Sequence, residues 1–193
     1  MKALDYEIIL ASKSPRRSQL LSEAGFKFSV KTKDTDESFP EDMDVMEVSP
    51  YLASKKMDDA IDLLEPGKIM LTADSVVIVD NQILNKPVDY QVAIRMLKLL
   101  NNKTHTVVTG ICLSDGNKKV VDKAISYVTI NYMNDLEMDY YIKNYKPFDK
   151  AGSYAIQEWI GHCKIGKIEG TYSNIMGLPV FLVYELLDKW DSE

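Results

Sequence analysis

The amino-acid sequence predicts an α/β fold with a mixed, twisted β-sheet flanked by helices, formed as one unit in one or two lobes. Three observations lead to this fold class. Short β-branched runs alternate with stretches of helical periodicity, two long β runs are joined by Asp-Gly-Asn at residues 115–117, and no internal repeat, low-complexity tract or linker-like stretch divides the chain. A chain of 193 residues with 46% hydrophobic residues can bury a substantial core without disulfide bonds.

The N-terminal part predicts a strand, a turn and a helix. Residues 6–11 are a short apolar run typical of a buried strand, and the polar turn Ser-Lys-Ser-Pro follows them. Ser14 suits the N-cap, Pro15 suits the first helical position, and Gly25 suits the helix end. We therefore expect the first helix between Pro15 and Gly25.

The next part predicts a strand, a helix and a β-hairpin. Residues 26–32 alternate apolar and polar side chains, and an acidic loop then leads to a helix over residues 48–64. Residues 69–80 form a β-branched run that a turn joins to a return strand at residues 83–87. Asp74 is then expected near the start of this hairpin, in a largely apolar setting.

A third helix precedes the two longest β runs. Asp89 is suited to cap this helix, whose apolar side chains share one face between residues 92 and 100. The β runs cover residues 105–115 and 118–133, and the turn between them is a strong hairpin signal. These elements add an antiparallel pair to the predicted sheet.

Two more helices are expected in the last third of the chain. Asn134 or Asp135 opens a helix that extends to Tyr145, where the following Pro147 stops it. After a glycine-containing stretch and a turn region, an amphipathic helix extends to Trp190.

Composition excludes several classes of function. The 23 Lys and Arg residues and 29 Asp and Glu residues give a net charge of −6, which argues against broad binding to nucleic acid or an anionic membrane. Cys112 and Cys163 fit no metal-binding or redox spacing, no segment approaches the roughly 20 apolar residues of a membrane span, and the N-terminus lacks signal-peptide features. We therefore expect a cytoplasmic protein.

Basic residues gather at the start of the first predicted helix. The first turn of a helix ordinarily favours acidic residues, because the helix dipole places about half a positive charge there. Arg16 and Arg17 occupy it instead, with the hydroxyls of Ser12 and Ser14 beside them. This pattern is typical of a phosphate-binding site. The alternative is that both arginines face solvent or pair with the acidic loop at residues 34–47.

Asp74 is the acidic residue that most needs a partner, because a carboxylate on or beside a buried strand is costly to leave unpaired. It is suited to ligate a divalent metal, to act as a base toward water, to cap a turn, or to pair with a lysine such as Lys56 or Lys86. Glu37 and Asp36 of the acidic loop are candidates to share Mg²⁺ with it. The alternative for Asp36 is an ordinary solvated side chain.

Other common kinds of active site are not supported. His105 and His162 lack the paired-ligand spacing of a zinc site, and the sequence has neither a GxSxG motif nor a Cys–His arrangement for covalent catalysis. Tyr154, Trp159 and Tyr172 are suited either to stack on a nucleobase or to pack in the core, and both interpretations stay open.

A series of short motifs follows the order found in one protein family. They are SKSPRRSQLL at residues 12–21, DTDES at 34–38, LASKK at 52–56, TADSVV at 72–77, NKP at 85–87, H-x-V-x-T at 105–109, DKAGSYAIQ at 149–157 and GTYSNIMGLP at 170–179. Together they resemble the Maf (septum-formation-inhibitor-like) family of nucleoside triphosphate pyrophosphatases, and the resemblance covers nearly the whole chain.

The resemblance implies a Maf and inosine-triphosphatase type of α/β fold, with one domain over residues 1–193 and a central cleft between two lobes. It implies hydrolysis of a nucleoside triphosphate to the monophosphate and pyrophosphate with a divalent metal, Mg²⁺ or Mn²⁺, in a homodimer. The site residues implied are Asp74 as catalytic acceptor; Glu37 and Asp74 as metal ligands; Arg16, Ser75 and Gln157 for substrate specificity; and Ser12, Ser14, Arg17, Lys56 and Lys86 for phosphate and substrate binding.

Gln157 indicates the branch of the family that cleaves dTTP and UTP, with modified pyrimidine nucleotides as further candidates. The branch that cleaves 7-methyl-GTP usually carries Glu at this position, whereas an amide offers both a donor and an acceptor to the edge of uracil or thymine. Ser75 departs from the usual Thr of the family and keeps only the hydroxyl. The alternatives are cleavage of 7-methyl-GTP, and a nucleotide-binding regulator of cell division that does not turn its ligand over.

Overall fold

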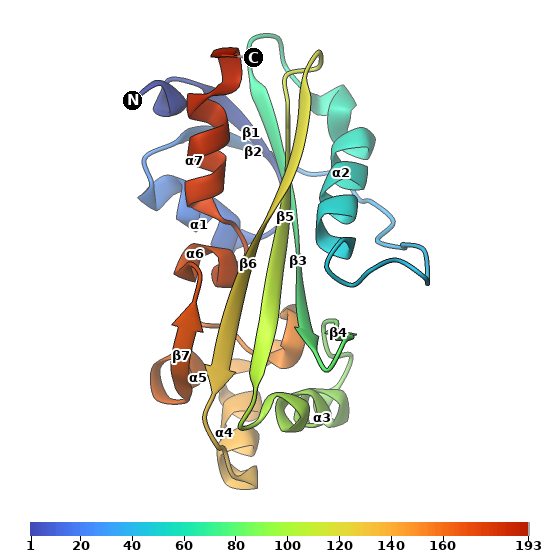
Figure 1. Cartoon of the computed structure of the whole chain (residues 1–193), viewed down its shortest axis with the longest axis vertical. Helices are drawn as coiled ribbons and strands as arrows, with labels where there is room; N and C mark the ends of the chain where they lie inside the picture. Colours follow the sequence, from blue (N-terminus) through green and yellow to red (C-terminus); the bar gives the residue numbers. More distant parts are fainter. Residues whose placement is uncertain (193) are drawn as a thin grey trace. The chain divides into compact units, whose positions relative to one another are not determined.

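The computed structural model describes residues 1–192 and confirms the predicted mixed α/β fold (Figure 1). The strands are β1 (Glu7–Ala11), β2 (Lys27–Lys31), β3 (Ile69–Val79), β4 (Gln82–Leu84), β5 (Thr104–Ser114), β6 (Lys119–Ile130) and β7 (Ile165–Glu169). The α-helices are α1 (Pro15–Glu23), α2 (Val48–Ala60), α3 (Tyr90–Leu100), α4 (Asp135–Tyr145), α5 (Trp159–Cys163), α6 (Tyr172–Met176) and α7 (Val180–Asp188). Short 3-10 helices lie at Lys2–Leu4, Ile61–Leu63, Pro147–Asp149, Ala151–Ser153 and Trp190–Ser192.

The strands form one mixed sheet in the order β2-β1-β3-β5-β6-β7, and β4 pairs with β3. β1 runs parallel to both of its neighbours, with Ile8 opposite Phe28 on one side and Ile69 on the other. β4 and β7 pair antiparallel with β3 and β6. Parallel neighbours need helical crossovers, which α1 and α2 supply. No helix among the described residues is long and apolar enough to span a membrane.

The chain divides into two compact units. Unit 1 consists of Met1–Asp74, Thr109–Ala124 and the residues from Gly177 onward, and unit 2 consists of Ser75–Val108 and Ile125–Met176. The long strands β3, β5 and β6 contribute residues to both units. The two units match the number of lobes that the family resemblance implies, while the assignment of the whole chain to a single domain stays a prediction.

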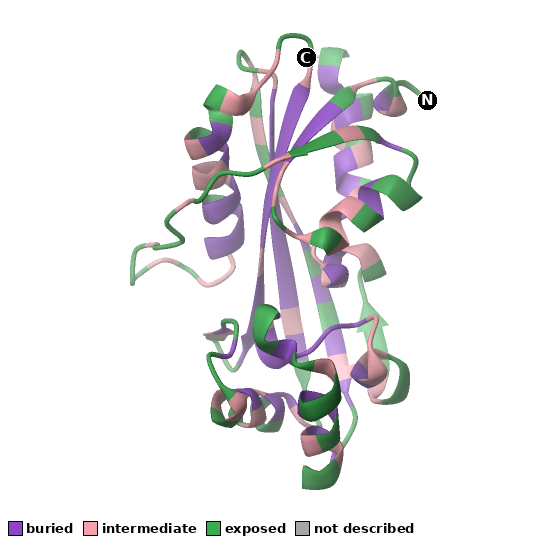
Figure 2. Cartoon of the chain, turned by 180° about the vertical axis from the view of Figure 1, so that it is seen from behind, coloured by how far each residue is buried: buried purple, intermediate pink, exposed green. Residues whose placement is uncertain are grey.

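Helices cover both faces of the sheet in unit 1, with α1 and α7 on one side and α2 on the other (Figure 1). The buried face of α2 packs Met57 against Ile9 of β1, and Figure 2 shows that the central strands β3 and β5 are buried along most of their length. Gly110 of β5 permits a close approach of α2, because a Cβ at this position would lie 2.3 Å from the backbone nitrogen of Pro50. The first turn of α2 therefore lies directly on β5.

The core of unit 2 is built around α3 and α4. Leu97 and Leu100 of α3 are fully buried in one cluster with Tyr141 of α4. Gly152 has a φ of +69°, and a Cβ there would lie 2.8 Å from Val77 Cγ1. The loop that contains Gly152 therefore packs closely on β3.

Local signals placed most helix ends correctly. Ser14 occupies the N-cap of α1, and Gly25, with a φ of +79°, follows its end. Asp89 accepts a hydrogen bond at the start of α3, and Asn134 forms a capping box with Glu137 at the start of α4. The side chain of Ser14 makes no capping hydrogen bond, so only its position is confirmed.

Three predicted positions were wrong. The helix expected over residues 48–64 ends at Ala60, where acidic residues oppose the negative end of the helix dipole, and a 3-10 turn follows. The C-terminal helix ends at Asp188, before Trp190. Asp74 lies in the middle of β3 rather than near the start of a hairpin, because the strand is a single buried run from Ile69 to Val79.

Candidate functional site

The turn between β1 and α1 holds four of the predicted site residues in unit 1. Ser12 Oγ accepts hydrogen bonds from the backbone amide of Ser14 and from Arg17 Nη1, each at 3.2 Å. Because Pro15 starts the helix, Arg16 and Arg17 both lie in its first turn, and both are partly buried. The turn therefore holds two guanidinium groups at the positive end of α1.

Arg17 holds the backbone next to Asp74. Its Nη1 donates to the carbonyl of Ala73 at 2.7 Å, and its Nε donates to the carbonyl of Gly177 at 2.8 Å. Burial lowers the pKa of Arg17, and the charges of Asp74 and Glu37 oppose this change. An arginine stays charged even so. Arg17 is thus bound to protein groups rather than facing solvent.

One lysine joins the two predicted metal ligands. Lys56 Nζ, from α2, lies 2.5 Å from Asp74 Oδ1 and 2.7 Å from Glu37 Oε1. The side chains of Asp74 and Lys56 are only 12% and 18% exposed, whereas that of Glu37 is 54% exposed. The acidic loop, α2 and β3 therefore bring these three charges together, as the resemblance implies.

The electrostatics of this cluster make Asp74 an unusual carboxylate. Burial raises its pKa, and the negative charge of Glu37 adds to that effect. The charge and hydrogen bond of Lys56 lower the pKa of Asp74, as does the charge of Arg17. Since burial dominates, Asp74 holds a proton more readily than an exposed aspartate does, which suits a group that accepts a proton from water.

The donor set also suits a hard divalent cation. Among the described residues, no group of three or more His, Cys, Asp and Glu side chains is arranged to hold a metal ion. Mg²⁺, however, is commonly held by one or two carboxylates, with phosphate and water oxygens completing its shell. Glu37 and Asp74 both reach the same lysine nitrogen, so their carboxylates converge on a point that a cation already occupies.

Asp36 lies outside this cluster. Its carboxylate accepts hydrogen bonds from Lys55 Nζ at 2.9 Å and from the backbone amide of Ser38 at 3.1 Å. The hydroxyl of Ser38, and then Lys55, lower the pKa of Asp36 to about 2. Asp36 is thus an exposed side chain paired with Lys55, and Glu37 is the acid of this loop that shares Lys56 with Asp74.

The remaining predicted residues belong to unit 2. Ser75 is partly buried on β3 and points to the same face of the strand as Val77, on which Gly152 packs. Lys86 is exposed. Gln157 is partly buried, and its Oε1 is fully buried with no hydrogen-bond partner among the described residues. A buried amide oxygen without a partner is costly, and a hydrogen bond from a donor group would relieve that cost.

Sequence reasoning missed the residues that hold the loop around Gln157. Tyr141 Oη donates to Glu158 Oε2, and it accepts a hydrogen bond from the backbone amide of Ala155 at 3.1 Å. Lys150, which is 8% exposed, lies 3.3 Å from Glu158 Oε1. The signal available in the sequence was an acid directly after Gln157 and a lysine seven residues before it, and neither is distinctive alone.

His105 is a core residue of unit 2. It is 2% exposed, and its Nε2 lies 2.7 Å from the hydroxyl of Tyr154, whose ring packs edge-on against it. Burial lowers the pKa of His105 to about 4, so it is neutral at pH 7. Tyr154 is thus committed to core packing rather than to stacking on a base.

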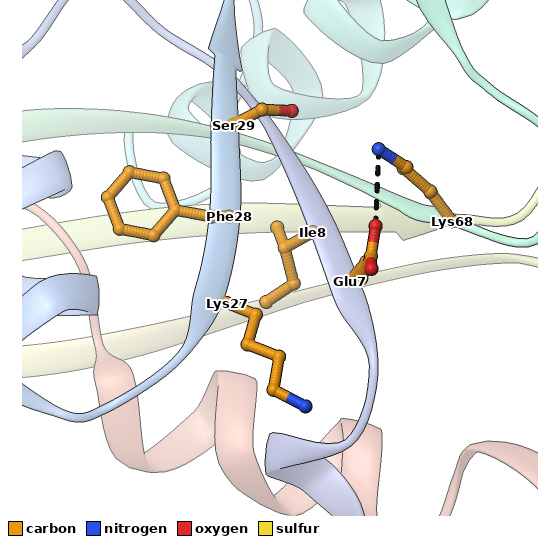
Figure 3. Close-up of a pocket in the computed structure, with 6 residues that line it drawn as sticks. All are labelled: Glu7, Ile8, Lys27, Phe28, Ser29 and Lys68. Carbon is orange, nitrogen blue, oxygen red and sulfur yellow. Dashed lines mark ion pairs between the residues drawn. The ribbon is translucent and has the colours of Figure 1, made fainter.

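A pocket of about 160 Å³ lies where β1 and β2 begin (Figure 3). It is lined by Glu7, Ile8, Lys27, Phe28, Ser29 and Lys68. Lys68 is already paired with Glu7 at 3.2 Å and with Glu65 at 2.8 Å. No residue of the predicted site lines this pocket, and we assign it no part in the activity.

A mixed α/β fold with guanidinium groups at a helix N-terminus and a carboxylate–lysine cluster beside them is the framework of an enzyme that acts on phosphate groups. The family model for Maf-like proteins matches residues 7–190. The chain therefore belongs to the Maf-like protein family.

The alignments with curated relatives cover nearly the whole of this chain and of each relative. A Porphyromonas gingivalis protein named dTTP/UTP pyrophosphatase is 44% identical over 97% of this chain and 96% of its own. Proteins of the same name from Bacteroides thetaiotaomicron and Flavobacterium johnsoniae are 40% and 39% identical, over 95% and 96% of this chain and 96% of each relative. A solved structure of the Staphylococcus aureus Ham1 protein is 15% identical, with a TM-score of 0.44, over 64% of this chain and 71% of that one.

Proposed function

We propose that this chain hydrolyses dTTP and UTP to the corresponding monophosphate and pyrophosphate. The Asp74–Lys56–Glu37 cluster carries this proposal, because it combines a buried carboxylate of raised pKa with cations beside it. Membership of the Maf-like family and the name shared by the three relatives support the choice of reaction and substrates.

Asp74 is the proton acceptor in this proposal. Water attacks the α-phosphorus in line, the bond from that phosphorus to the bridging oxygen breaks, and pyrophosphate leaves with the electron pair. The proton of the attacking water passes to Asp74, whose burial favours the protonated form. Lys56 and Arg17 oppose the effect of burial on the pKa of Asp74, and they thereby favour the ionised form that can accept the proton.

Basic and hydroxyl groups bind the phosphates. Arg16 and Arg17 lie at the positive end of α1, where an anion is favoured by the helix dipole and by both guanidinium groups. Ser12 and Ser14 add polar groups in the same turn. Lys56 and Lys86 are the further cations that we propose for this role, the second from unit 2.

Mg²⁺ or Mn²⁺ is the proposed cofactor, and Glu37 and Asp74 would hold it. When bound, the ion neutralises charge on the phosphates and on the leaving group. Lys56 already contacts both carboxylates, so this lysine has to share or exchange their oxygens when the ion binds. The proposal therefore includes competition between a divalent cation and Lys56 for the same carboxylates.

Gln157 and Ser75 are the proposed base-recognition residues of unit 2, and Arg16 is the specificity residue of unit 1. The unpartnered Oε1 of Gln157 can accept from the N–H of uracil or thymine, while its amide nitrogen donates to a carbonyl of the same ring. A carboxylate at this position would lose the donor. We also propose a cytoplasmic homodimer, and the free cysteines Cys112 and Cys163 are compatible with a reducing compartment.

A substrate panel tests the proposed function. Pyrophosphate release is measured with dTTP, UTP, CTP and 7-methyl-GTP, each with Mg²⁺ and with Mn²⁺, for the wild-type chain and for Asp74→Asn. We expect dTTP and UTP to be cleaved by the wild type and nearly all turnover to be lost in the variant. Preference for 7-methyl-GTP would favour the other branch, and binding without pyrophosphate release would favour a regulator.

A further inference from the structure

A buried tyrosine ties the loop of Gln157 to the body of unit 2. The side chain of Tyr141, on α4, is completely buried. Its hydroxyl donates to Glu158 Oε2 and accepts from the backbone amide of Ala155. One hydroxyl therefore fixes the chain at two points, two residues before Gln157 and one residue after it.

Lys150 completes this network. Its ammonium lies 3.3 Å from Glu158 Oε1 and 2.8 Å from Asp149 Oδ1, and its side chain is 10% exposed. The carboxylate of Glu158 thus has a hydroxyl on one oxygen and a cation on the other. A partly buried carboxylate with both partners is held in one orientation, and the loss of either partner frees it to move.

Backbone hydrogen bonds also restrict the loop around Gln157. The amide of Glu158 donates to the carbonyl of Ala155 at 3.2 Å, which closes a tight turn around Gln157. Upstream, Gly152 and Ser153 both adopt positive φ, and the amide of Gly152 donates to the carbonyl of Asn85 at 3.3 Å. The loop is strained at one end and held by Tyr141 at the other.

We propose that Tyr141, acting through Glu158 and Lys150, is a positioning residue for base selectivity: it holds the turn that presents the amide of Gln157 to the pyrimidine. This inference rests on the proposed function, in which Gln157 reads the base. Tyr141 belongs to unit 2, whereas the Asp74 cluster belongs to unit 1. The loss of Tyr141 should therefore impair recognition of the base rather than the chemical step.

Tyr141→Phe removes only the hydroxyl. The ring still fills its site, but Glu158 and the amide of Ala155 each lose a partner, and the turn that carries Gln157 loosens. We expect the KM for dTTP and for UTP to rise about tenfold, while kcat changes less than about twofold. The preference for UTP over CTP, as a ratio of kcat/KM values, should fall by a similar factor.

Tyr145→Phe is the matched control. Tyr145 stacks on Tyr141 with ring centroids 5.0 Å apart and an interplanar angle of 17°, so it sits in the same helix and the same aromatic pair. Among the described residues, the Tyr145 hydroxyl makes no hydrogen bond to the loop of Gln157. This control separates the loss of one particular hydroxyl from a general weakening of α4.

Gln157→Ala separates the inference from the proposed function. If this variant loses its base preference while Tyr141→Phe behaves like Tyr145→Phe in KM and in selectivity, the positioning role of Tyr141 is overturned and the proposed role of Gln157 stands. If Gln157→Ala keeps its base preference, the proposed base reader fails, and the inference fails with it. Raised KM, unchanged kcat and reduced selectivity for Tyr141→Phe alone would support the inference.

Glu158→Gln keeps the test decisive if Tyr141→Phe does not fold. The amide still accepts from the Tyr141 hydroxyl but no longer pairs with the charge of Lys150. We expect KM to rise about threefold while kcat stays nearly unchanged. A Glu158→Gln enzyme with wild-type KM and selectivity would contradict the network.

Discussion

The replacement of Lys56 by methionine tests the cluster around Asp74 through stability as well as through activity. Methionine keeps the apolar stem of the lysine and removes the ammonium that contacts Asp74 Oδ1 at 2.5 Å and Glu37 Oε1 at 2.7 Å. The variant leaves a buried carboxylate with a like charge beside it and without its main cationic partner. Both properties raise the pKa of Asp74 further.

The size of the effect follows from the burial of the pair. Breaking a fully buried ion pair costs about 3 to 5 kcal/mol. Because the side chains of Asp74 and Lys56 keep 12% and 18% of their exposure, we expect a loss of about 2 to 3 kcal/mol in the free energy of unfolding at pH 7. Urea denaturation measures this quantity.

The pH dependence has a definite sign. Burial makes the pKa of Asp74 higher in the folded chain than in the unfolded chain. The folded state therefore takes up a proton first as the pH falls, and acid relieves the cost of the buried charge. The destabilisation of Lys56→Met should be largest at neutral pH and smaller at pH 5. The acid limb of its kcat/KM profile should move to higher pH.

Lys55→Met is the control for this experiment. Lys55 is the neighbouring residue on α2, but its partner Asp36 has a side chain that is 72% exposed, so this pair contributes little to stability. We expect Lys55→Met to unfold like the wild type at both pH values. The reasoning is refuted if Lys56→Met matches Lys55→Met at pH 7, or if its loss of stability is the same at pH 5 and pH 7.

Three further predictions concern other residues. Gln157→Glu should weaken the hydrolysis of dTTP and UTP, because the side chain loses the N–H that donates to a carbonyl of the base. Unchanged kinetics with both substrates would contradict this role. Arg17→Lys keeps the charge but loses the guanidinium hydrogen bonds to the carbonyls of Ala73 and Gly177, so urea denaturation should show a loss of about 1 to 3 kcal/mol in the free energy of unfolding. Wild-type stability would show that these two hydrogen bonds do not stabilise the fold. Gly110→Ala should lower the melting temperature strongly, because its Cβ would lie 2.3 Å from a backbone atom of α2; a wild-type melting curve would exclude the close contact.

The fold was predictable wherever the decisive physics is local. Pro15 and Gly25 mark the ends of α1, and Asp89 and Asn134 mark the starts of α3 and α4, because each acts within a single turn of the chain. The position of Asp74 was not predictable in the same way. The start and the middle of a β-branched run have the same kinds of residue. Only the pairing of β3 with β1 and β4 therefore fixes where the strand begins and ends.

The site was predictable only in part for a similar reason. The spacing of residues nominated Asp74, Glu37 and Lys56 among other acids and lysines, and the resemblance selected them. Their meeting at one ammonium is a tertiary contact that brings the acidic loop onto α2 and β3. The roles of Tyr141 and Glu158 were not predictable, because tyrosine and glutamate are common residues and their contact joins α4 to a loop 17 residues further along the chain.

Hydrolysis in water enriched in ¹⁸O shows which phosphorus atom the water attacks. With dTTP and Mg²⁺, attack on the α-phosphorus places the label in the monophosphate and leaves the released pyrophosphate unlabelled. We expect this result for the wild type, and we expect Asp74→Asn to lose nearly all product while the chain stays folded. Label in the pyrophosphate, release of inorganic phosphate alone, or full turnover by Asp74→Asn would contradict it.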